Sequence, residues 1–271
     1  MAASPLLQVR GLRRRYGVRT GLFGPWHEVV AVEGVDFTIE RGEIVGIIGA
    51  SGSGKSTIGR LLTGLDEPDG GEILFDNTRI DRLTDQARRP LRRRLQLVLQ
   101  DASSALNPRR RVGAQIAMPM LRLGIAGSRE DARERTAQLL RLVGLGPDAT
   151  ERYPHEFSGG QRQRINIARS LGVEAECLIL DEPTSALDVS VQAQILALLL
   201  ELRQQFSLTY LFISHNLAVV QSFCDRILVL DKGRLVENLP SRTITKQAKA
   251  PATRRLLEAN LSLSRVPAAQ P

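Results

Sequence analysis

The sequence has 271 residues, of which 42% are hydrophobic and 24% are charged, and these proportions exclude fibrous and intrinsically disordered proteins. A chain of this length forms one large domain or two modest ones. Its net charge of +8 leaves three alternatives open: binding to nucleic acid, binding to an anionic membrane surface, or neither.

The N-terminal part of the chain alternates short apolar runs with glycine-rich breaks, which predicts strands joined by loops. Residues 17–26 contain three glycines and a proline and are expected to form a loop. A nearly unbroken apolar run at 43–48 predicts a strand buried on both faces. A helix is expected at 55–62, after the glycine-rich residues 49–54. Further strands are expected at 6–10, 29–32, 35–39, 71–76 and 95–99.

From about residue 101 to residue 171, strand patterns are absent and helical periodicity dominates. Helices are expected at 116–123, 130–143 and 161–171, which indicates a helical insertion within an α/β domain. The α/β pattern then returns, with a strand at 177–180, a helix at 191–206 and a strand at 209–213.

One face of the 191–206 helix is expected to lie in the core, because its apolar residues recur at helical spacing. These residues are Ile195, Leu198, Leu199, Leu202 and Phe206. Farther along, Asp231-Lys232-Gly233 between two apolar runs predicts a β-hairpin over 227–236. Residues 240–271 lose periodicity and are expected to form a tail with one helix near 253–260.

The positive charge is carried mainly by arginines in short, separated clusters. The clusters are Arg13–Arg15, Arg88–Arg89, Arg92–Arg94 and Arg109–Arg111. Aromatic residues make up only 4% of the chain and do not alternate with these clusters, whereas proteins that bind single strands stack bases on aromatic rings. We therefore interpret the clusters as solvated surface, or secondarily as surface near membrane headgroups, and expect no nucleic-acid partner.

No apolar run approaches the roughly 18 residues that a membrane span requires. The first residues also lack the apolar core of a signal peptide, so the chain is expected to stay in the cytoplasm. Cys177 and Cys224 lie among apolar residues and are expected to be buried. The histidines His27, His155 and His215 are too scattered for a recognisable metal cluster.

Nine residues after the buried strand match the phosphate-loop pattern G-x-x-x-x-G-K-[ST]. They are Gly49, Ala50, Ser51, Gly52, Ser53, Gly54, Lys55, Ser56 and Thr57. Glycines let successive backbone N–H groups curl around phosphate oxygens at the positive end of the following helix. Lys55 is expected to contact the β- and γ-phosphates, and the Ser56 hydroxyl to ligate Mg²⁺. The pattern predicts a nucleotide-binding site.

A second apolar strand ends in two carboxylates, Asp181 and Glu182. Ligands of parallel sheets bind at the carboxyl ends of the strands, so both acids are expected near the nucleotide. Asp181 is expected to hold Mg²⁺, usually through water, while Glu182 polarises the water that attacks the γ-phosphate.

A third motif, Ser158-Gly159-Gly160-Gln161, opens a predicted helix. Serine can cap a helix and glycines expose backbone N–H groups, so this motif predicts a second anion site. Because one nucleotide does not need two such loops in one chain, this loop is expected to serve a nucleotide bound to another subunit.

Together these motifs resemble, over residues 6–238, the ATP-binding subunits of ABC transporters. Residues 49–57 match the Walker A motif, 178–182 the Walker B motif and 158–161 the signature motif. Gln100 matches the Q-loop, residues 185–188 the D-loop, His215 the switch histidine and Tyr16 the adenine-stacking aromatic. For Tyr16 the alternative is core packing, and Phe23 and Trp26 lie in the same predicted loop.

The resemblance implies an α/β fold of the P-loop NTPase, ABC type, with an antiparallel β subdomain and a helical insertion subdomain. The nucleotide-binding domain would span residues 1–239, with the helical subdomain at about 101–171 and a C-terminal tail at 240–271. Two such domains would pair head to tail around two ATP molecules, with each phosphate loop facing the partner's signature loop.

Within that pair, Gln100 would sense Mg²⁺ and the attacking water, beside the groove that receives the transporter's coupling helix. His215 would bond the γ-phosphate, Asp188 would cross the interface and Tyr16 would stack on adenine. The implied partners are transmembrane permease subunits, a second ABC ATPase subunit, identical or paralogous, and indirectly a periplasmic or extracellular substrate-binding protein. The implied location is peripheral, at the cytoplasmic face of the inner membrane.

The segment from Gln100 to Arg109 is similar to that of the oligopeptide, dipeptide and nickel importer branch, as are residues 153–157 and 211–220. This favours a peptide importer. The tail lacks the histidine and tyrosine of peptide-branch ATPases, so a nickel or metal-chelate importer is the alternative. An alternative of another class is a soluble ABC ATPase acting on nucleic acid or the ribosome, disfavoured by the single cassette and the lack of a coiled-coil insertion.

Overall fold

The computed structural model describes residues 4–19, 21, 24–102 and 104–264. The chain divides into two compact units. The first contains the residues up to Thr84 together with those from Leu211 onward, and the second is Asp85–Tyr210. Strand β8 (Thr209–Ile213) carries the chain from the second unit back into the first.

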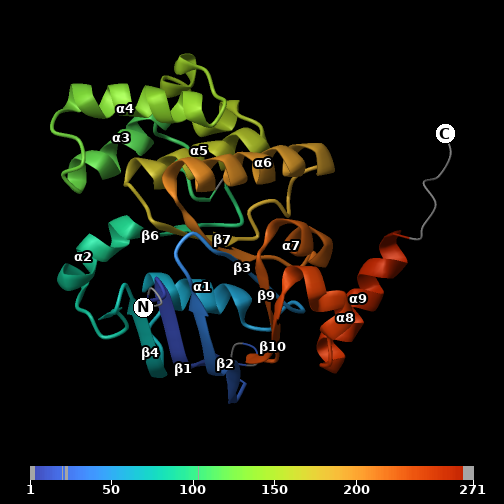
Figure 1. The fold of residues 1–271 in the computed structure, drawn as a ribbon. Helices are drawn as coiled ribbons and strands as arrows, with labels where there is room; N and C mark the ends of the chain where they lie inside the picture. The colour runs from blue at the N-terminus through green and yellow to red at the C-terminus, as the bar shows by residue number, and fades with distance from the viewer. Residues whose placement is uncertain (1–3, 20, 22–23, 103, 265–271) are drawn as a thin grey trace. The chain divides into compact units, whose positions relative to one another are not determined.

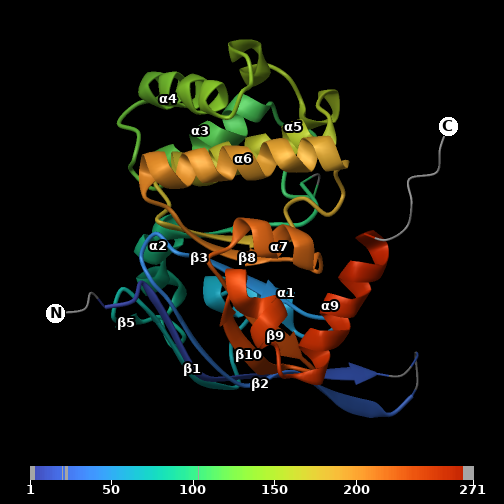
Figure 2. The same ribbon diagram turned by 45° about the vertical axis from the view of Figure 1, so that its right-hand side comes forward.

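The first unit begins with an antiparallel sheet in the order β2-β1-β4-β5. Its strands are β1 (Leu7–Arg19), β2 (Trp26–Ile39), β4 (Gly70–Phe75) and β5 (Thr78–Arg79). Figure 2 shows the ends of β1 and β2 continuing as a hairpin beyond the rest of this sheet. The expected β subdomain is therefore present.

The hairpin is longer than the sequence predicted, since residues 17–19 and Trp26, expected to be loop, are strand. Gly17 pairs with Glu28, and Arg19 pairs with Trp26. A Cβ atom on Gly17 would lie 3.3 Å from the Trp26 ring. The missing side chain of Gly17 thus makes room for the Trp26 ring. This glycine, which in the sequence suggested the start of a loop, instead allows β1 and β2 to pair. Phe23 lies outside the described residues.

The remaining strands of the first unit include β3 (Ile44–Ile48), β9 (Arg226–Asp231) and β10 (Arg234–Pro240). All five residues of β3 are buried, as the apolar run predicts, and β3 runs parallel to β9. Strands β9 and β10 form the predicted hairpin, whose turn has positive φ at Lys232 and Gly233.

The helices of the first unit follow these strands (Figure 1). Helix α1 (Lys55–Thr63) comes directly after the phosphate loop, and α7 (Leu217–Phe223) comes after β8. The C-terminal segment adds η3 (Ser241–Thr243), α8 (Ile244–Gln247) and α9 (Pro251–Ser264), so the expected tail is more helical than its sequence suggested. The Glu237 carboxylate on β10 accepts a hydrogen bond of 2.8 Å from the Ala250 N–H and another from the Lys249 N–H, which holds the start of α9.

The second unit contains the predicted helical insertion. Helices α3 (Val112–Arg122), α4 (Arg129–Leu142) and α5 (Gly159–Gly172) pack on one another, as Figure 1 shows in green and yellow. Two short turns, η1 (Pro147–Thr150) and η2 (Pro154–Glu156), connect α4 to α5. The other elements are α2 (Asp85–Arg94), β6 (Leu95–Val98), β7 (Cys177–Asp181) and α6 (Val189–Phe206).

Helix α6 buries four of its five predicted core residues. Phe206 is the exception, with 45% of its surface exposed. It is the last residue of the helix, and Ser207 then turns the chain through a positive φ, so Phe206 lies beyond the buried part of the face. Cys177 and Cys224 are buried as predicted. Within the described residues, the helices are all too short or too polar to cross a membrane.

Candidate nucleotide-binding site

The phosphate loop connects β3 to α1, and its backbone can be made only by glycine at two positions. Gly54 has a φ of 103°, and a Cβ there would lie 2.1 Å from the Ala31 carbonyl oxygen. A Cβ on Gly49 would lie 2.2 Å from the Leu230 carbonyl oxygen. Such contacts are far below van der Waals distance, so β2 and β9 hold the loop in a shape that admits no side chain at either position.

Polar groups converge inside this loop. The Lys55 ammonium donates hydrogen bonds to the carbonyls of Gly49 (2.8 Å) and Ala50 (2.9 Å), and only 6% of Lys55 is exposed. Gly54 is the N-cap of helix α1 and offers no side-chain cap, and the positive end of the helix dipole faces the loop. The Ser53 hydroxyl oxygen is buried with no hydrogen-bond partner among the described residues. A phosphate oxygen is the acceptor that these donors suit.

His215 follows β8 within the same unit and is exposed. The Ser214 N–H donates to the Ile47 carbonyl (3.1 Å), which ties the end of β8 to the strand that leads into the phosphate loop. On the other side, Asn216 caps α7 by accepting a hydrogen bond from the Val219 N–H. The histidine is therefore held between two fixed neighbours at a strand's carboxyl end.

Tyr16 is half-buried, and its hydroxyl donates to the Asp66 carboxylate at 2.8 Å. The Arg14 guanidinium lies over its ring, 4.7 Å from the centroid. Hydrogen bonds from Arg60 lower the pKa of the Asp66 carboxyl, with Tyr16 contributing and burial opposing. Arg14 also pairs with Asp69 (3.0 Å), so this member of the Arg13–Arg15 cluster is not the freely solvated residue that we expected.

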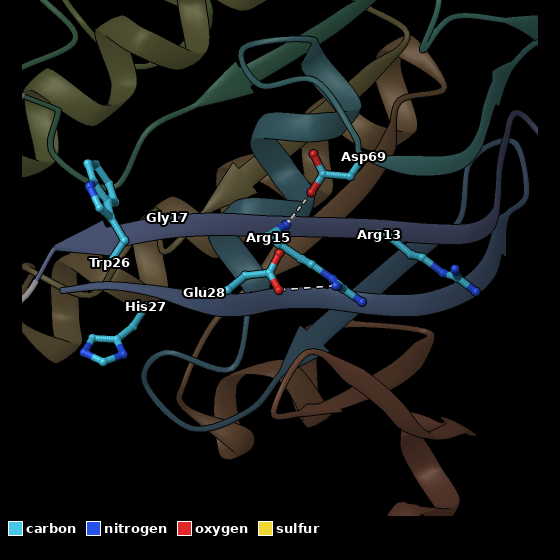
Figure 3. Close-up of a pocket in the computed structure, with 7 residues that line it drawn as sticks. All are labelled: Arg13, Arg15, Gly17, Trp26, His27, Glu28 and Asp69. Atoms are coloured by element: carbon cyan, nitrogen blue, oxygen red, sulfur yellow. Dashed lines mark hydrogen bonds and ion pairs between the residues drawn. The ribbon is translucent and has the colours of Figure 1, made fainter.

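A separate hollow of about 660 Å³ lies on the β1–β2 hairpin and contains no residue of the phosphate loop (Figure 3). In this view Trp26 and His27 point to opposite sides of β2. The Arg15 guanidinium reaches Glu28 at 3.3 Å, and the Arg15 N–H donates to Asp69 at 2.6 Å. Most charged groups that line this hollow are therefore paired with one another.

In the second unit, strand pairing brings two predicted residues together. Strand β6 runs parallel to β7, with Val98 opposite Leu180. Gln100 and Glu182 each follow two residues later, and the Gln100 amide nitrogen donates to the Glu182 carboxylate at 3.0 Å. Asp181, the last residue of β7, is buried, while Glu182 is half-buried and has a φ of 46°. A left-handed backbone at a glutamate is strained, which is common at functional sites.

Ser185 also contacts this pair, a contact that the D-loop motif alone does not predict. Its hydroxyl accepts from the Gln100 amide nitrogen (3.3 Å) and donates to the Glu182 carbonyl (3.1 Å). Asp188 caps α6 by accepting hydrogen bonds from the Val191 N–H (2.9 Å) and the Ser190 hydroxyl (2.7 Å). The hydrogen bond from Ser190 is the main cause that lowers the pKa of Asp188.

The signature motif opens α5 with a reciprocal capping box. The Ser158 hydroxyl accepts from the Gln161 N–H (3.3 Å), and the Gln161 side chain accepts from the Ser158 N–H (2.9 Å). A Cβ on Gly160 would lie 2.4 Å from a methyl group of Val191, so this glycine permits α5 and α6 to approach. Gly159, at the first helical position, adds no side chain at this N-terminus beyond the capping box.

Comparison with known proteins gives the family. Residues 32–185 match the sequence profile of the ABC transporter family. The di/tripeptide transport ATP-binding protein DppF of Pseudomonas aeruginosa (strain UCBPP-PA14) is 46% identical over 254 residues, which is 94% of this chain and 78% of that protein. The glutathione import ATP-binding protein GsiA of Salmonella choleraesuis (strain SC-B67) is 47% identical over 98% of this chain and 42% of its own length.

Solved structures agree with these relatives. The ATP-binding cassette MJ0796, in a dimeric post-hydrolysis state bound to ADP and Pi, superimposes with a TM-score of 0.77 at 29% identity, covering 87% of this chain and 99% of that one. The cassette cbiO1 from Clostridium perfringens has the same TM-score at 27% identity over 97% of this chain and 98% of its own. The family profile spans more than half of the chain, and the relatives cover nearly all of it. The chain therefore belongs to the ABC transporter family and is an ATP-binding, ATP-hydrolysing cassette.

Proposed function

We propose that this chain is the ATP-hydrolysing subunit of a membrane importer for short peptides. The observation that carries the proposal is the 46% identity to a di/tripeptide transport ATP-binding protein over 94% of the chain. Several further relatives, from Brucella species, are named putative peptide import ATP-binding proteins and are equally similar over 96% of the chain. The likeness extends well beyond the motifs that all ABC ATPases share.

The first unit supplies the groups that would hold the phosphates. Lys55 and the backbone amides of residues 49–57 would bind the β- and γ-phosphates, because the ammonium already lies inside the loop. Ser53 would donate its buried hydroxyl to a phosphate oxygen. His215 would donate to the γ-phosphate, and Tyr16 would stack on adenine with the ring face that Arg14 does not cover.

The residues assigned to Mg²⁺ fit that ion by their chemistry. Mg²⁺ prefers oxygen ligands, and Ser56, Asp181 and Gln100 offer a hydroxyl, a carboxylate and an amide oxygen. The Gln100 amide nitrogen is turned towards Glu182, so the oxygen is the end suited to a ligand. Mg²⁺ when bound would neutralise charge on the phosphates. Glu182 would accept the proton of the attacking water, and Gln100 would orient that carboxylate.

A second cassette would complete the site. MJ0796 is dimeric in two of the solved structures that match this chain. The signature residues 158–161 begin a helix whose N-terminus suits an anion, and we assign them to the nucleotide held by the partner cassette. Asp188, which caps the neighbouring helix α6, would contribute at the same interface.

The permease would dock on the helical insertion. A groove of about 800 Å³ lies between α3, α4 and η1, in the unit that also carries Gln100. Small and flexible residues such as Ala114, Ala117 and Met118 line it, together with the exposed Arg129 and Arg133. An amphipathic helix with acidic residues would fit there. Such docking would hold the chain peripherally at the cytoplasmic face of the membrane, with a substrate-binding protein on the opposite side.

Uptake of a labelled dipeptide and of labelled nickel, in parallel, by cells that lack the native gene tests the proposal. Cells would carry wild-type protein, Glu182→Gln or Ala117→Trp. Loss of the base is expected to lower hydrolysis by about 10²–10⁴-fold while ATP binding remains, and dipeptide uptake should fall in parallel. Ala117→Trp should fill the groove and abolish uptake while purified protein still hydrolyses ATP.

The controls separate the parts of this proposal. Gln138→Trp changes an exposed position on α4 outside the groove and should leave uptake intact. Selective loss of nickel uptake in Glu182→Gln would replace the peptide substrate by a metal. Hydrolysis near the wild-type rate in Glu182→Gln would remove this residue from the role of base.

A further inference from the structure

A pocket in the second unit gathers several of the arginines that the proposed function leaves unused. It has a volume of about 470 Å³ and lies between α2, the end of α3 and the segment that follows α5. Figure 1 shows α2 next to β6 at the edge of this unit. The residues that line the pocket are Arg89, Pro90, Arg93, Arg94, Arg122, Leu123, Glu174 and Glu176.

Two of the four arginines are fixed by carboxylates. Arg94 binds Glu176 through two parallel contacts, of 2.5 Å and 2.8 Å, and Arg93 pairs with Glu174. Glu174 has a φ of 57°, a conformation that glutamate rarely adopts. Its carboxylate also lies 4.0 Å from Arg135. The paired guanidinium groups are therefore held in place before any ligand arrives.

The other two arginines keep their charge available. Arg89 and Arg122 are exposed. Arg89 acts on Asp85 only as a minor electrostatic neighbour, since Arg92 is the residue that pairs with that carboxylate. With two carboxylates against four guanidinium groups, the pocket retains an excess of two positive charges. Pro90 and Leu123 add apolar surface at its wall.

We propose that this pocket binds an anionic phosphate ester. Guanidinium groups present planar pairs of N–H donors that match phosphate oxygens two at a time. The same chemistry comes from two sources, the headgroup of an anionic phospholipid and a soluble phosphate ester. The pocket thus gives a ligand to Arg89, Arg93 and Arg94, which belong to two of the arginine clusters of the sequence. A role of this pocket at the membrane would rest on the proposed function. Binding of a phosphate ester does not depend on that function.

Binding can be measured with the whole purified chain and two probes. Phosphatidylglycerol vesicles, compared with phosphatidylcholine vesicles in a sedimentation assay at physiological salt, supply the headgroup. Glycerol 3-phosphate, titrated by calorimetry, supplies the soluble ester. The variant Arg89→Ala/Arg122→Ala removes the unpaired charges, and Arg141→Ala/Arg242→Ala removes two exposed arginines elsewhere, so both variants have the same net charge.

The pocket variant should bind its phosphate source about 25-fold more weakly than wild type, because each arginine near an anionic surface contributes about fivefold. The control variant should lose much less. Loss with vesicles alone identifies the lipid headgroup, and loss with glycerol 3-phosphate as well identifies a site for soluble esters. Equal losses in both double variants, or no binding of either probe, would overturn the proposal. ATP hydrolysis, measured alongside, should be unchanged in the pocket variant, so the outcome is independent of the proposed function.

Discussion

The phosphate loop and the Gln100–Glu182 pair differ in the groups that they present: the loop presents mainly backbone groups, and the pair presents side chains. The loop uses backbone groups, is packed against other strands and has a buried lysine at its centre. The pair uses side chains that are half-buried or exposed and that come from separate segments. Substitutions in the loop should therefore act through the fold, whereas substitutions around Glu182 should act through the rate of hydrolysis.

The largest effect on stability is expected at Gly54. In Gly54→Ala the new methyl group would meet the Ala31 carbonyl at 2.1 Å. We expect a loss of about 3 kcal/mol or more in the free energy of unfolding, measured by urea denaturation. Gly52→Ala is the matched control, because Gly52 also has a positive φ but its Cβ would meet nothing within 4 Å. It should cost about 1 kcal/mol. Equal losses would mean that φ alone, and not the contact with β2, restricts this loop.

A kinetic effect without a stability effect is expected at Gln100. Removing the amide in Gln100→Ala leaves Glu182 without the donor 3.0 Å away, so the carboxylate should be less well oriented. ATP turnover should fall about a hundredfold, as for other single positioned donors. The free energy of unfolding should change by less than about 0.5 kcal/mol because Gln100 is exposed. Gln138→Ala serves as the control. A large fall in the free energy of unfolding would mean that Gln100, like the phosphate loop, is needed for the fold and does not act only on the rate of hydrolysis.

The smallest effect is expected at the two helix caps of the second unit, one of which titrates. The pKa of Asp188 is lowered chiefly by the Ser190 hydrogen bond. Its stabilising effect is therefore complete above the unfolded pKa, near 3.9, and is lost as the pH falls through the lower folded pKa. Asp188→Asn keeps an acceptor but does not titrate. The melting temperature of wild type should exceed that of the variant at about pH 6, and the gap should close towards about pH 3. A difference in melting temperature that stays constant with pH would mean that the charge of Asp188 does not stabilise α6. The Ser158 cap of α5 has no charge, so its contribution should not depend on pH in this range.

Sequence predicts best where the constraint is local. The phosphate loop, the buried strand before it and the turn at Asp231–Gly233 are encoded by adjacent residues, and the structure contains each of them. The helices of the insertion begin and end within a few residues of the predicted positions, because their apolar periodicity is long and regular. The family resemblance rests on the same local motifs.

Prediction fails where distant residues decide the outcome. The bonds from Gln100 to Glu182 and Ser185 depend on the register of β6 and β7, which no local pattern gives. Residues 17–19 are strand because Trp26 packs over Gly17 from the opposite strand. Arg94 and Arg14 are paired because Glu176 and Asp69 reach them from far along the chain. Helix α2, with Pro90 inside it and no buried residue, has no apolar periodicity from which to predict it.

The pairing of β3 with β9 has a consequence for how the protein is made. Val45 pairs with Arg226, and the whole second unit is encoded between them. On the ribosome, the antiparallel strands β1, β2 and β4 can pair as soon as they emerge, but β3 waits for β9 until most of the chain has been synthesised. Five consecutive buried residues of β3 are thus without that partner during translation. Nascent chains of this protein should therefore depend on chaperones until β9 emerges.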